Sequence, residues 1–553
     1  MRDSKSVREY RVLDKDIAVF EDKLHGSGSF EMKLFIPTKE NRAMMQSELD
    51  VLFERHRNLE ASDEVFSIVK DHTGDFLEGL QSDLDNLYNA PSGRILSALG
   101  FSFITLIRRD TRPEPMRIKI LEARMLQCET LFTAIFDLLG ELHVGELNQF
   151  LSRMINLCET IKTEQEDLHL FINCRNDDDF KMLMCKVQSF IDIINDRIDD
   201  LKIMIADKGE VPKIIQRGEG EVLPQDIDVY RNALRAHDVD LDEILSWHEA
   251  EIEKTRNECF SIANSLDIPD VPVKTMTQVN DILLKYAGPA GSAEEMYERA
   301  TEYVTRGTAA AREYVWLPDD ADCPPMVMYK QMKKSYPWGA GGSASPYSRP
   351  FEGRFMLNDE NYHAITDGWI KINCTHEVHP GHYTQFLRSL LDPLPETMKR
   401  GAKNTCLTEG MCIRTEKLFE YIFPEDKFYP LFTAYRRHHT SVRIMVDLWL
   451  RYFGKTIGDA LDLYVRELGF DRNSARIQVQ AHENDYGYFT TYYYGYRKVA
   501  EWESLYGFDK KEYTELLFSL SRVSLNTFER YLKLSEADRF SLTHEFASLI
   551  QFK

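Results

Sequence analysis

The sequence lacks the features that would place a chain of 553 residues in an extracellular or membrane class. None of its nine cysteines forms a C-x-x-C pair, and their number is odd, which indicates reduced thiols rather than a disulfide framework. No apolar run is long enough to cross a bilayer, and the charged residues 1–5 are unlike a secretory signal. We therefore expect a cytoplasmic protein.

The chain also has fewer basic residues than acidic ones. The chain has 68 lysines and arginines against 90 aspartates and glutamates, which gives a formal net charge of −22 at pH 7. Such a surface repels phosphate backbones and anionic lipid headgroups, so we expect no nucleic acid and no membrane as partner. The acidic excess is typical of a soluble protein and identifies no substrate.

Helical periodicity is what the sequence has in abundance. Residues 116–142 and 180–205 place apolar side chains three and four positions apart, which is the spacing of one helix face. Glycine, proline and charged residues gather at 208–224, as in a connection between two lobes. We predict a mainly α fold with an N-terminal helical lobe over residues 1–224 and a second, catalytic region over residues 225–553.

Residues 315–358 differ from this helical pattern. Residues 336–346 are rich in glycine and serine, and we predict a loop there, but it lacks the G-K-[ST] ending of a phosphate-binding loop. Residues 353–358 (GRFMLN) are the best candidate for a short strand. The fold is therefore expected to contain at most a small β element.

Histidine is concentrated in one part of the chain, since seven of the 15 lie between His363 and His482. The informative cluster is residues 376–382, with the sequence HEVHPGH. A hydrolytic zinc site needs three protein ligands, an open position and a carboxylate that takes a proton from water. His376 and the adjacent Glu377 are of the right types to supply one ligand and this carboxylate.

The choice of the second ligand is open between two histidines. The H-E-x-x-H zinc motif would need a histidine at position 380, where the chain has Pro380. His379 lies three positions after His376 and shares its helix face. His382 lies six positions after His376, roughly 120° away on a straight helix, but a kink at the Pro-Gly pair would bring it round. The spacing alone favours neither.

This segment resembles the H-E-x-x-P-G-H-x-x-Q hallmark of a bacterial family called domain of unknown function 885, with Gln385 as its last residue. Three later segments agree in order. Residues 409–416 (EGMCIRTE) are similar to the family's E-G-W-A-x-Y-x-E, residues 443–447 to its R-x-x-x-D, and residues 492–495 to its Y-x-x-G. The family's fold is similar to that of carboxypeptidases of the Taq type, which implies a two-lobe, zinc-peptidase-like fold with a deep central cleft.

The resemblance implies a set of metal ligands. It selects His382 over His379, which falls at a variable position of the hallmark, and it adds Glu409 to His376 as a third ligand of a zinc ion. Chemistry agrees with this choice. Glu409 and Glu416 are seven positions apart and so lie on one helix face, and zinc accepts imidazole and carboxylate ligands together.

The resemblance also implies roles for residues around the metal. Glu377 would act as the general base, and Tyr492 would donate a hydrogen bond to the developing oxyanion. Arg443 would bind a substrate carboxylate. An ion pair between Arg443 and Asp447 on one helix face is an equal alternative.

Two tyrosines, Tyr347 before the hallmark and Tyr494 in the Y-x-x-G segment, complete the expected substrate contacts. The chain departs from the family pattern elsewhere. Met411 stands in place of a tryptophan, and Arg451 in place of a histidine. A family arginine, proline and glutamine are replaced by Ala481, Tyr486 and Tyr488. Because these positions shape the pocket, the family's substrate preference is not carried over.

Residues 436–439 (RRHH) combine positive charge and imidazole groups close to these motifs. A basic run in a helix is most often a solvated helix face. We therefore predict that these four side chains point to solvent and take no part in the site.

Together, these residues predict a metal-dependent hydrolase, of a carboxypeptidase-like kind, that cleaves a peptide or a small amide substrate. Two alternatives stay open. The same metal scaffold would also suit a non-peptide metabolite, and a catalytically silent helical binding protein would keep the fold without the ion. Metal content separates the silent protein from the two enzymes.

Overall fold

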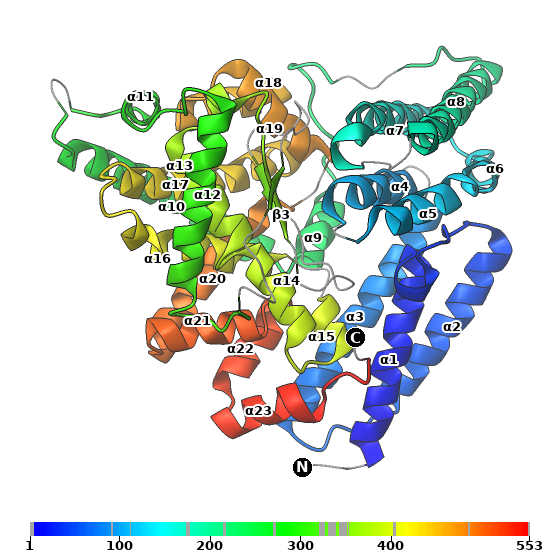
Figure 1. Ribbon diagram of the computed structural model, residues 1–553, viewed down its shortest axis with the longest axis horizontal. Coiled ribbons are helices and arrows are strands. Elements are labelled where there is room, and N and C mark those ends of the chain that lie inside the picture. The colour runs from blue at the N-terminus through cyan, green and yellow to red at the C-terminus, as the bar shows by residue number, and fades with distance from the viewer. Residues whose placement is uncertain are drawn as a thin grey trace. The chain divides into compact units, whose positions relative to one another are not determined.

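The computed structural model describes residues 5–89, 92–110, 112–172, 177–213, 217–268, 272–319, 327–329, 339–341, 351, 353–401, 405–484 and 487–550. The chain divides into two compact units. Unit 1 comprises Met1–Gln216, Pro393–Thr397 and Ala537–Lys553, and unit 2 comprises Arg217–Asp392 and Met398–Glu536. Helices dominate both units, which confirms the mainly α class predicted from the sequence (Figure 1).

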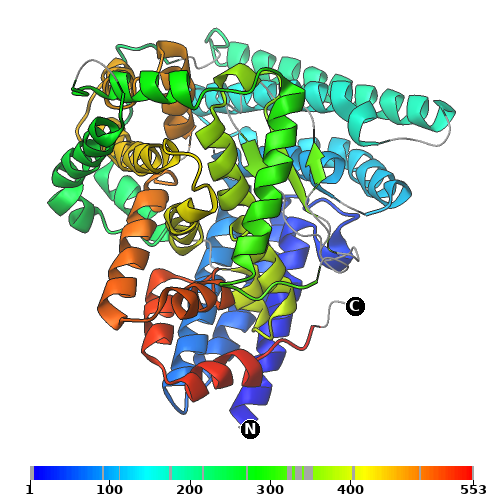
Figure 2. The same cartoon turned by 60° about the vertical axis from the view of Figure 1, so that its left-hand side comes forward.

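Unit 1 is a set of packed helices, most of them blue or cyan in Figure 1. They are α1 (Lys5–His25), α2 (Lys39–Arg57), α3 (Glu64–Tyr88), α4 (Arg94–Ile104), α5 (Glu114–Met125), α6 (Cys128–Leu139), α7 (Val144–Phe171), α8 (Asp177–Asp207) and α23 (Glu536–Glu545). Apolar side chains at helical spacing, such as Phe66, Val69 and Phe76 of α3, fill its core. The two longest helices, α7 and α8, lie side by side (Figure 2).

Unit 2 contains all the residues predicted to bind metal. Its helices are α9 (Ile227–Ala236), α10 (Leu241–Ser265), α11 (Met276–Tyr286), α12 (Ala293–Ala311), α13 (Asp367–Asn373), α14 (His382–Leu391), α16 (Cys406–Leu418), α17 (Tyr429–Arg451), α18 (Ile457–Leu468), α19 (Arg472–Asn484), α20 (Thr490–Tyr506), α21 (Lys510–Ser519) and α22 (Leu525–Lys533). The short helix α15 (Glu396–Arg400) begins in the segment assigned to unit 1. Helices α10, α16, α17 and α20 pack together and form the frame of the candidate site.

A small sheet is the β element of unit 2. Strand β3 (Arg354–Leu357) lies between β1 (Val327–Tyr329), to which it is parallel, and β2 (Gly339–Gly341), to which it is antiparallel. The strand predicted over residues 353–358 is confirmed. The prediction of a loop over residues 336–346 is wrong for Gly339–Gly341, because glycines without side chains can still pair through their backbone.

Helix α17 is buried along nearly its whole length, including residues 436–439. The prediction of a solvated face there is wrong. Arg437 forms an ion pair with Glu258 at 2.6 Å, and Nδ1 of His438 lies 2.9 Å from the hydroxyl of Thr255. Both partners belong to α10, so a neighbouring helix supplies the polar contacts that solvent would otherwise give.

The cysteines of the described residues are free thiols. The seven cysteines within the described ranges form no disulfide, as the sequence predicts. Among the helices described, none combines the length and the apolar character needed to span a lipid bilayer.

Candidate metal centre

His376 and His382 lie on either side of a break between two helices. Helix α13 runs into a π-helical turn, Cys374–Val378, and α14 starts at His382 after three residues that are not helical. Gly381 makes this break possible, because a Cβ atom there would lie 1.9 Å from the backbone oxygen of His376. The chain therefore uses a helix end and a new start where the sequence suggested one kinked helix.

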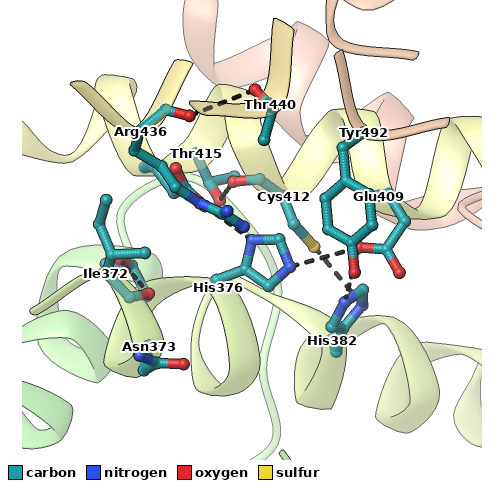
Figure 3. A network of polar contacts seen from close by, with 12 residues as sticks. Ile372, Asn373, His376, His382, Glu409, Cys412, Thr415, Arg436, Thr440 and Tyr492 are labelled. Carbon is teal, nitrogen blue, oxygen red and sulfur yellow. Dashed lines mark hydrogen bonds and ion pairs between the residues drawn. The ribbon is translucent and has the colours of Figure 1, made fainter. Parts of the chain in front are cut away.

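The break brings the two imidazole rings together (Figure 3). Their centroids are 4.8 Å apart and their planes are nearly perpendicular, at 86°. Glu409, in the first turn of α16, points into the same space. Its Oε2 lies 3.3 Å from Nε2 of His376 and 3.3 Å from Nε2 of His382, and none of the three side chains is more than 14% exposed. The structure thus brings the three predicted ligands to one point.

A second layer of polar groups orients both rings. Nδ1 of His376 lies 2.8 Å from Oε1 of Glu416, and Nδ1 of His382 lies 2.8 Å from Oε1 of Gln385. The Gln385 amide is itself oriented, because its Nε2 donates to the backbone oxygen of Thr408 at 2.9 Å. Since both Oε1 atoms can only accept, each imidazole donates from Nδ1. In the neutral form, each therefore turns the lone pair of Nε2 toward Glu409.

The centre consequently gathers three electron-pair donors around one small space. Oε2 of Glu409 is buried and has no hydrogen-bond partner among the described residues. Acceptors that face one another in a buried place need a cation between them, either protons on the imidazoles or a metal ion. Two imidazole nitrogens and a carboxylate oxygen are ligands that zinc accepts, so the residues present fit a divalent ion.

The electrostatics of the centre favour positive charge on the imidazoles. Burial lowers the pKa of His376, but the carboxylates of Glu409 and Glu416 outweigh burial and raise this pKa to about 10. The pKa of His382 is raised in the same way, against burial, by Cys412 and Glu409. Burial disfavours the charged Glu409, yet His382 and His376 hold the pKa of its carboxyl far below the usual value.

Cys412 is a neighbour that the sequence reasoning missed. It is buried on α16, one turn after Glu409, and its Sγ lies 3.6 Å from Nδ1 of His382. One candidate ligand atom from each of Cys412, His376 and His382 falls within 4.8 Å of the others, so the thiol is a further candidate ligand (Figure 3). The sequence could have indicated this neighbour, because Cys412 lies three positions after Glu409 and residues three positions apart on a helix share a face.

Two tyrosines near the start of α20 complete the polar contacts. Tyr488 donates to Oε1 of Glu409 at 3.1 Å, and its hydroxyl lies 2.9 Å from that of Tyr492. Tyr492 stacks on His376, with ring centroids 6.1 Å apart and an interplanar angle of 13°. Burial and Glu409 raise the pKa of both phenols, so both keep their protons. The sequence marked Tyr488 only as a departure from the family pattern.

His379, the alternative ligand, makes other contacts. Its Nδ1 lies 2.8 Å from the hydroxyl of Thr384, and its ring packs on Tyr383 with centroids 5.0 Å apart. It is His382 that comes within ion-pair distance of Glu409. Of these two histidines, it is therefore His382 that faces Glu409, while His379 faces Thr384.

Arg443 lies in α17 and does not form the ion pair that was the alternative to substrate binding. Its guanidinium donates to Oε1 of Gln478 at 3.2 Å. Asp447 is engaged elsewhere, since Oδ1 lies 2.6 Å from Nδ1 of His482 and Oδ2 accepts a hydrogen bond from Thr490 at 2.9 Å.

The remaining predicted residues have different positions. Glu377 lies in the π-helical turn and is partly exposed. Tyr494 is not brought to the centre, because its hydroxyl donates to Glu243 at 2.6 Å and its ring stacks on Trp247. Tyr347 lies outside the described residues.

Comparison with known proteins identifies relatives of this fold and motif. A family model described as "Bacterial protein of unknown function (DUF885)" matches residues 187–527, which is more than half of the chain. None of the curated proteins matches the sequence.

Two solved structures are similar to the chain over nearly its whole length. A "putative lipoprotein of unknown function" from Shewanella oneidensis gives a TM-score of 0.69 at 15% identity, covering 96% of this chain and 100% of that chain. A "putative lipoprotein" from Colwellia psychrerythraea gives a TM-score of 0.72 at 14% identity, covering 96% of this chain and 98% of that one. At these identities the likeness shows a shared fold alone.

Proposed function

We propose that this chain, which belongs to the DUF885 family of bacterial proteins, is a metal-dependent hydrolase. His376, His382 and Glu409 hold a divalent cation, which we expect to be zinc. The observation that carries the proposal is the position of Oε2 of Glu409, buried and 3.3 Å from two imidazole nitrogens without a hydrogen-bond partner in the described ranges. Three protein ligands leave one position open, as in hydrolytic rather than structural zinc sites.

Each polar residue of the centre has a task in this proposal. The cation, when bound, polarises a carbonyl group and activates water. Glu377 accepts the proton of the attacking water and passes it to the leaving amine. Tyr492, which keeps its proton, donates a hydrogen bond to the developing oxyanion, and Tyr488 donates to Glu409. Glu416 and Gln385 keep the two imidazoles in the orientation that ligation needs.

The reaction class is hydrolysis of a peptide or amide bond. The family's fold, which we expect to be similar to that of carboxypeptidases of the Taq type, favours a peptide substrate. One observation favours a non-peptide metabolite as second candidate: Tyr488 replaces a family glutamine and bonds directly to Glu409, so the pocket beside the centre differs from the family pattern.

Metal analysis tests the binding part of the proposal. Purified protein loaded with zinc is expected to retain one ion per chain, and His376→Ala and Glu409→Ala are expected to lose it. His379→Ala is the matched control, since this buried histidine of the same segment bonds to Thr384 instead. Wild-type protein that retains no ion would contradict the metal centre and favour a catalytically silent binding protein.

A substrate panel tests the catalytic part. Zinc-loaded protein is expected to hydrolyse members of a set of short peptides and small non-peptide amides, and removal of the metal by a chelator is expected to abolish the activity. Activity confined to the small amides would favour the second candidate. A retained ion without hydrolysis of any member would contradict the hydrolase.

A further inference from the structure

The two oxygens of the Glu409 carboxylate have different surroundings. Oε2 faces Nε2 of His376 and Nε2 of His382, each at 3.3 Å (Figure 3). Oε1 instead accepts a hydrogen bond from the hydroxyl of Tyr488 at 3.1 Å. A carboxylate can bind a cation through one oxygen or through both. The contact with Tyr488 therefore bears on how many coordination positions Glu409 would fill.

The phenol of Tyr488 is the donor in this hydrogen bond, because an ionised carboxylate can only accept. A phenol has a single proton to donate. Tyr488 is therefore the acceptor in its contact with Tyr492, whose hydroxyl lies 2.9 Å away. The proton of Tyr488 is thus committed to Oε1 of Glu409.

The backbone restricts where the Tyr488 side chain can lie. Tyr488 belongs to the turn before α20, where its carbonyl oxygen accepts hydrogen bonds from the hydroxyl and the N–H of Thr491, at 2.6 and 3.1 Å. Gly487, just before it, has a φ of +74°, which favours glycine, and a Cβ atom there would lie 2.8 Å from the side chain of Leu234. The turn therefore has little freedom to carry the phenol away from the carboxylate.

We propose that Tyr488 is a positioning residue that holds Oε1 of Glu409 away from the bound cation, so that this carboxylate ligates through one oxygen. A hydrolytic zinc site needs an open position beside its three protein ligands. A carboxylate that ligated through both oxygens would occupy that position. The inference rests on the proposed function and adds how the chain keeps the site open. It concerns a position at which the chain departs from the family pattern, since Tyr488 stands in place of a glutamine.

Removal of the Tyr488 hydroxyl would leave Oε1 without this donor. Glu409 is only 5% exposed, so water reaches its carboxylate poorly. A buried charged group that loses a hydrogen bond pays a large desolvation cost, and contact with the bound cation would offset it. Tyr488→Phe is therefore expected to keep its metal ion while Oε1 moves onto the ion and the open position is lost.

Azide is a suitable probe, because this small anion binds at open positions of metal ions. In cobalt-substituted protein, azide is expected to change the visible absorption of the wild type and to have no effect on Tyr488→Phe. With zinc, kcat/KM of the variant is expected to fall about 10- to 100-fold, the usual effect of removing a group behind a metal ligand. A merely structural role for Tyr488 would not abolish azide binding at a retained ion.

Tyr493→Phe is the matched control. It removes a hydroxyl from α20 that also donates to a buried carboxylate, that of Glu251, at 2.8 Å. This glutamate is not among the candidate ligands, so the control is expected to bind azide and to hydrolyse substrate as the wild type does. Loss of azide binding in both variants would overturn the inference, because the effect would then not depend on Glu409.

A crystal structure of the zinc-loaded wild type gives a test that needs no variant. Oε2 of Glu409 alone is expected on the ion, with Oε1 still bonded to Tyr488, and both oxygens on the ion would overturn the inference. Wild-type azide affinity in Tyr488→Phe, or loss of the ion from this variant, would also overturn it.

Failure of the proposed function is distinguishable from failure of this inference. Wild-type protein that retains no ion would overturn both. A retained ion without hydrolysis of any substrate would overturn the hydrolase alone, because azide binding and the crystal structure still decide the role of Tyr488. A wild type that hydrolyses substrate with both oxygens of Glu409 on the ion would overturn the inference alone.

Discussion

Gly410 of α16 and Gly495 of α20 meet with their backbones in contact. A Cβ atom added to Gly410 would lie 2.2 Å from the carbonyl carbon of Gly495, and one added to Gly495 would lie 2.0 Å from the backbone oxygen of Cys406. Backbone atoms cannot turn aside as the end of a side chain would. The contact therefore sets Glu409, next to Gly410, against Tyr492, one turn before Gly495.

Gly410→Ala and Gly495→Ala are each expected to push α16 and α20 apart. Overpacking costs about 1–3 kcal/mol and sometimes more, and the displaced Glu409 would also bind zinc less tightly. Denaturant unfolding and zinc titration measure the two effects. Gly145→Ala is the control, because a Cβ atom at this position of α7 meets nothing within 4 Å. Unchanged stability and zinc affinity in both site variants would show that the contact is not tight.

The second layer gives another test. Glu416 lies 2.8 Å from Nδ1 of His376 and also within 3.6 Å of Nε of Arg436. Glu416→Gln removes the charge that makes the imidazole a stronger ligand, so zinc affinity is expected to fall about 10- to 100-fold. Competition with a chelator measures it. Glu503→Gln is the control. It removes the carboxylate that pairs with Arg414, which lies on α16 as Glu416 does. Equal affinity in the two variants would exclude a role for Glu416 behind the metal.

Part of this centre could be predicted from the sequence because its signals are local. The histidines lie within seven residues of one another, and Glu409 opens a segment with its own pattern. The convergence of Glu409 with Tyr488 depends instead on the close packing of α16 against α20, which is a tertiary property. The spacing of a motif does not show which helix face meets which, so Tyr488 could not be placed beside the metal ligands.

The burial of residues 436–439 shows the same limit for the fold. Helical periodicity is a local property, and the mainly α class follows from it. Whether a basic helix face meets solvent or protein depends on partners elsewhere in the chain. Here Glu258 and Thr255 of α10 are those partners. The sequence of α17 alone does not predict them.

Replacement of Cys412 tests whether the candidate metal centre has three protein ligands or four. Its Sγ approaches Nδ1 of His382, which already bonds to Gln385, whereas Glu409 lies against Nε2. We therefore expect the thiol to stay outside the ligand set. Cobalt-substituted wild type should show no thiolate-to-cobalt charge-transfer absorption, and Cys412→Ser should keep its zinc, as should the control Cys406→Ser. A band that disappears only in Cys412→Ser would make this thiol a fourth ligand and close the site.

Asp14 of α1 predicts a pH dependence of the stability of unit 1. It is buried and accepts hydrogen bonds from the backbone N–H groups of Glu396 and Thr397, at 2.7 and 3.0 Å. Burial raises the pKa of Asp14 to about 6, although these hydrogen bonds act in the opposite direction. The folded state therefore holds the proton more tightly than the unfolded state, and stability falls as pH rises from about 4 to about 6.

Asp14→Asn cannot ionise and should lack this loss. Across the same pH window, the variant is expected to gain up to about 3 kcal/mol of unfolding free energy relative to wild type, from the size of the pKa shift. Denaturant unfolding of both proteins at pH 4 and at pH 7 measures the change. A difference between variant and wild type that is the same at both pH values would contradict the raised pKa.

Glu377 separates metal binding from catalysis. It lies in the π-helical turn with His376 but is partly exposed, whereas the candidate ligands His376 and Glu409 are buried. Glu377→Gln removes a base and not a ligand, so zinc content should stay at the wild-type level while kcat falls about 10²–10⁴-fold. Glu377→Asp, which keeps a carboxylate on a shorter side chain, should recover part of the rate. A near-normal rate in the glutamine variant would remove Glu377 from the mechanism, and loss of zinc would place it among the ligands instead.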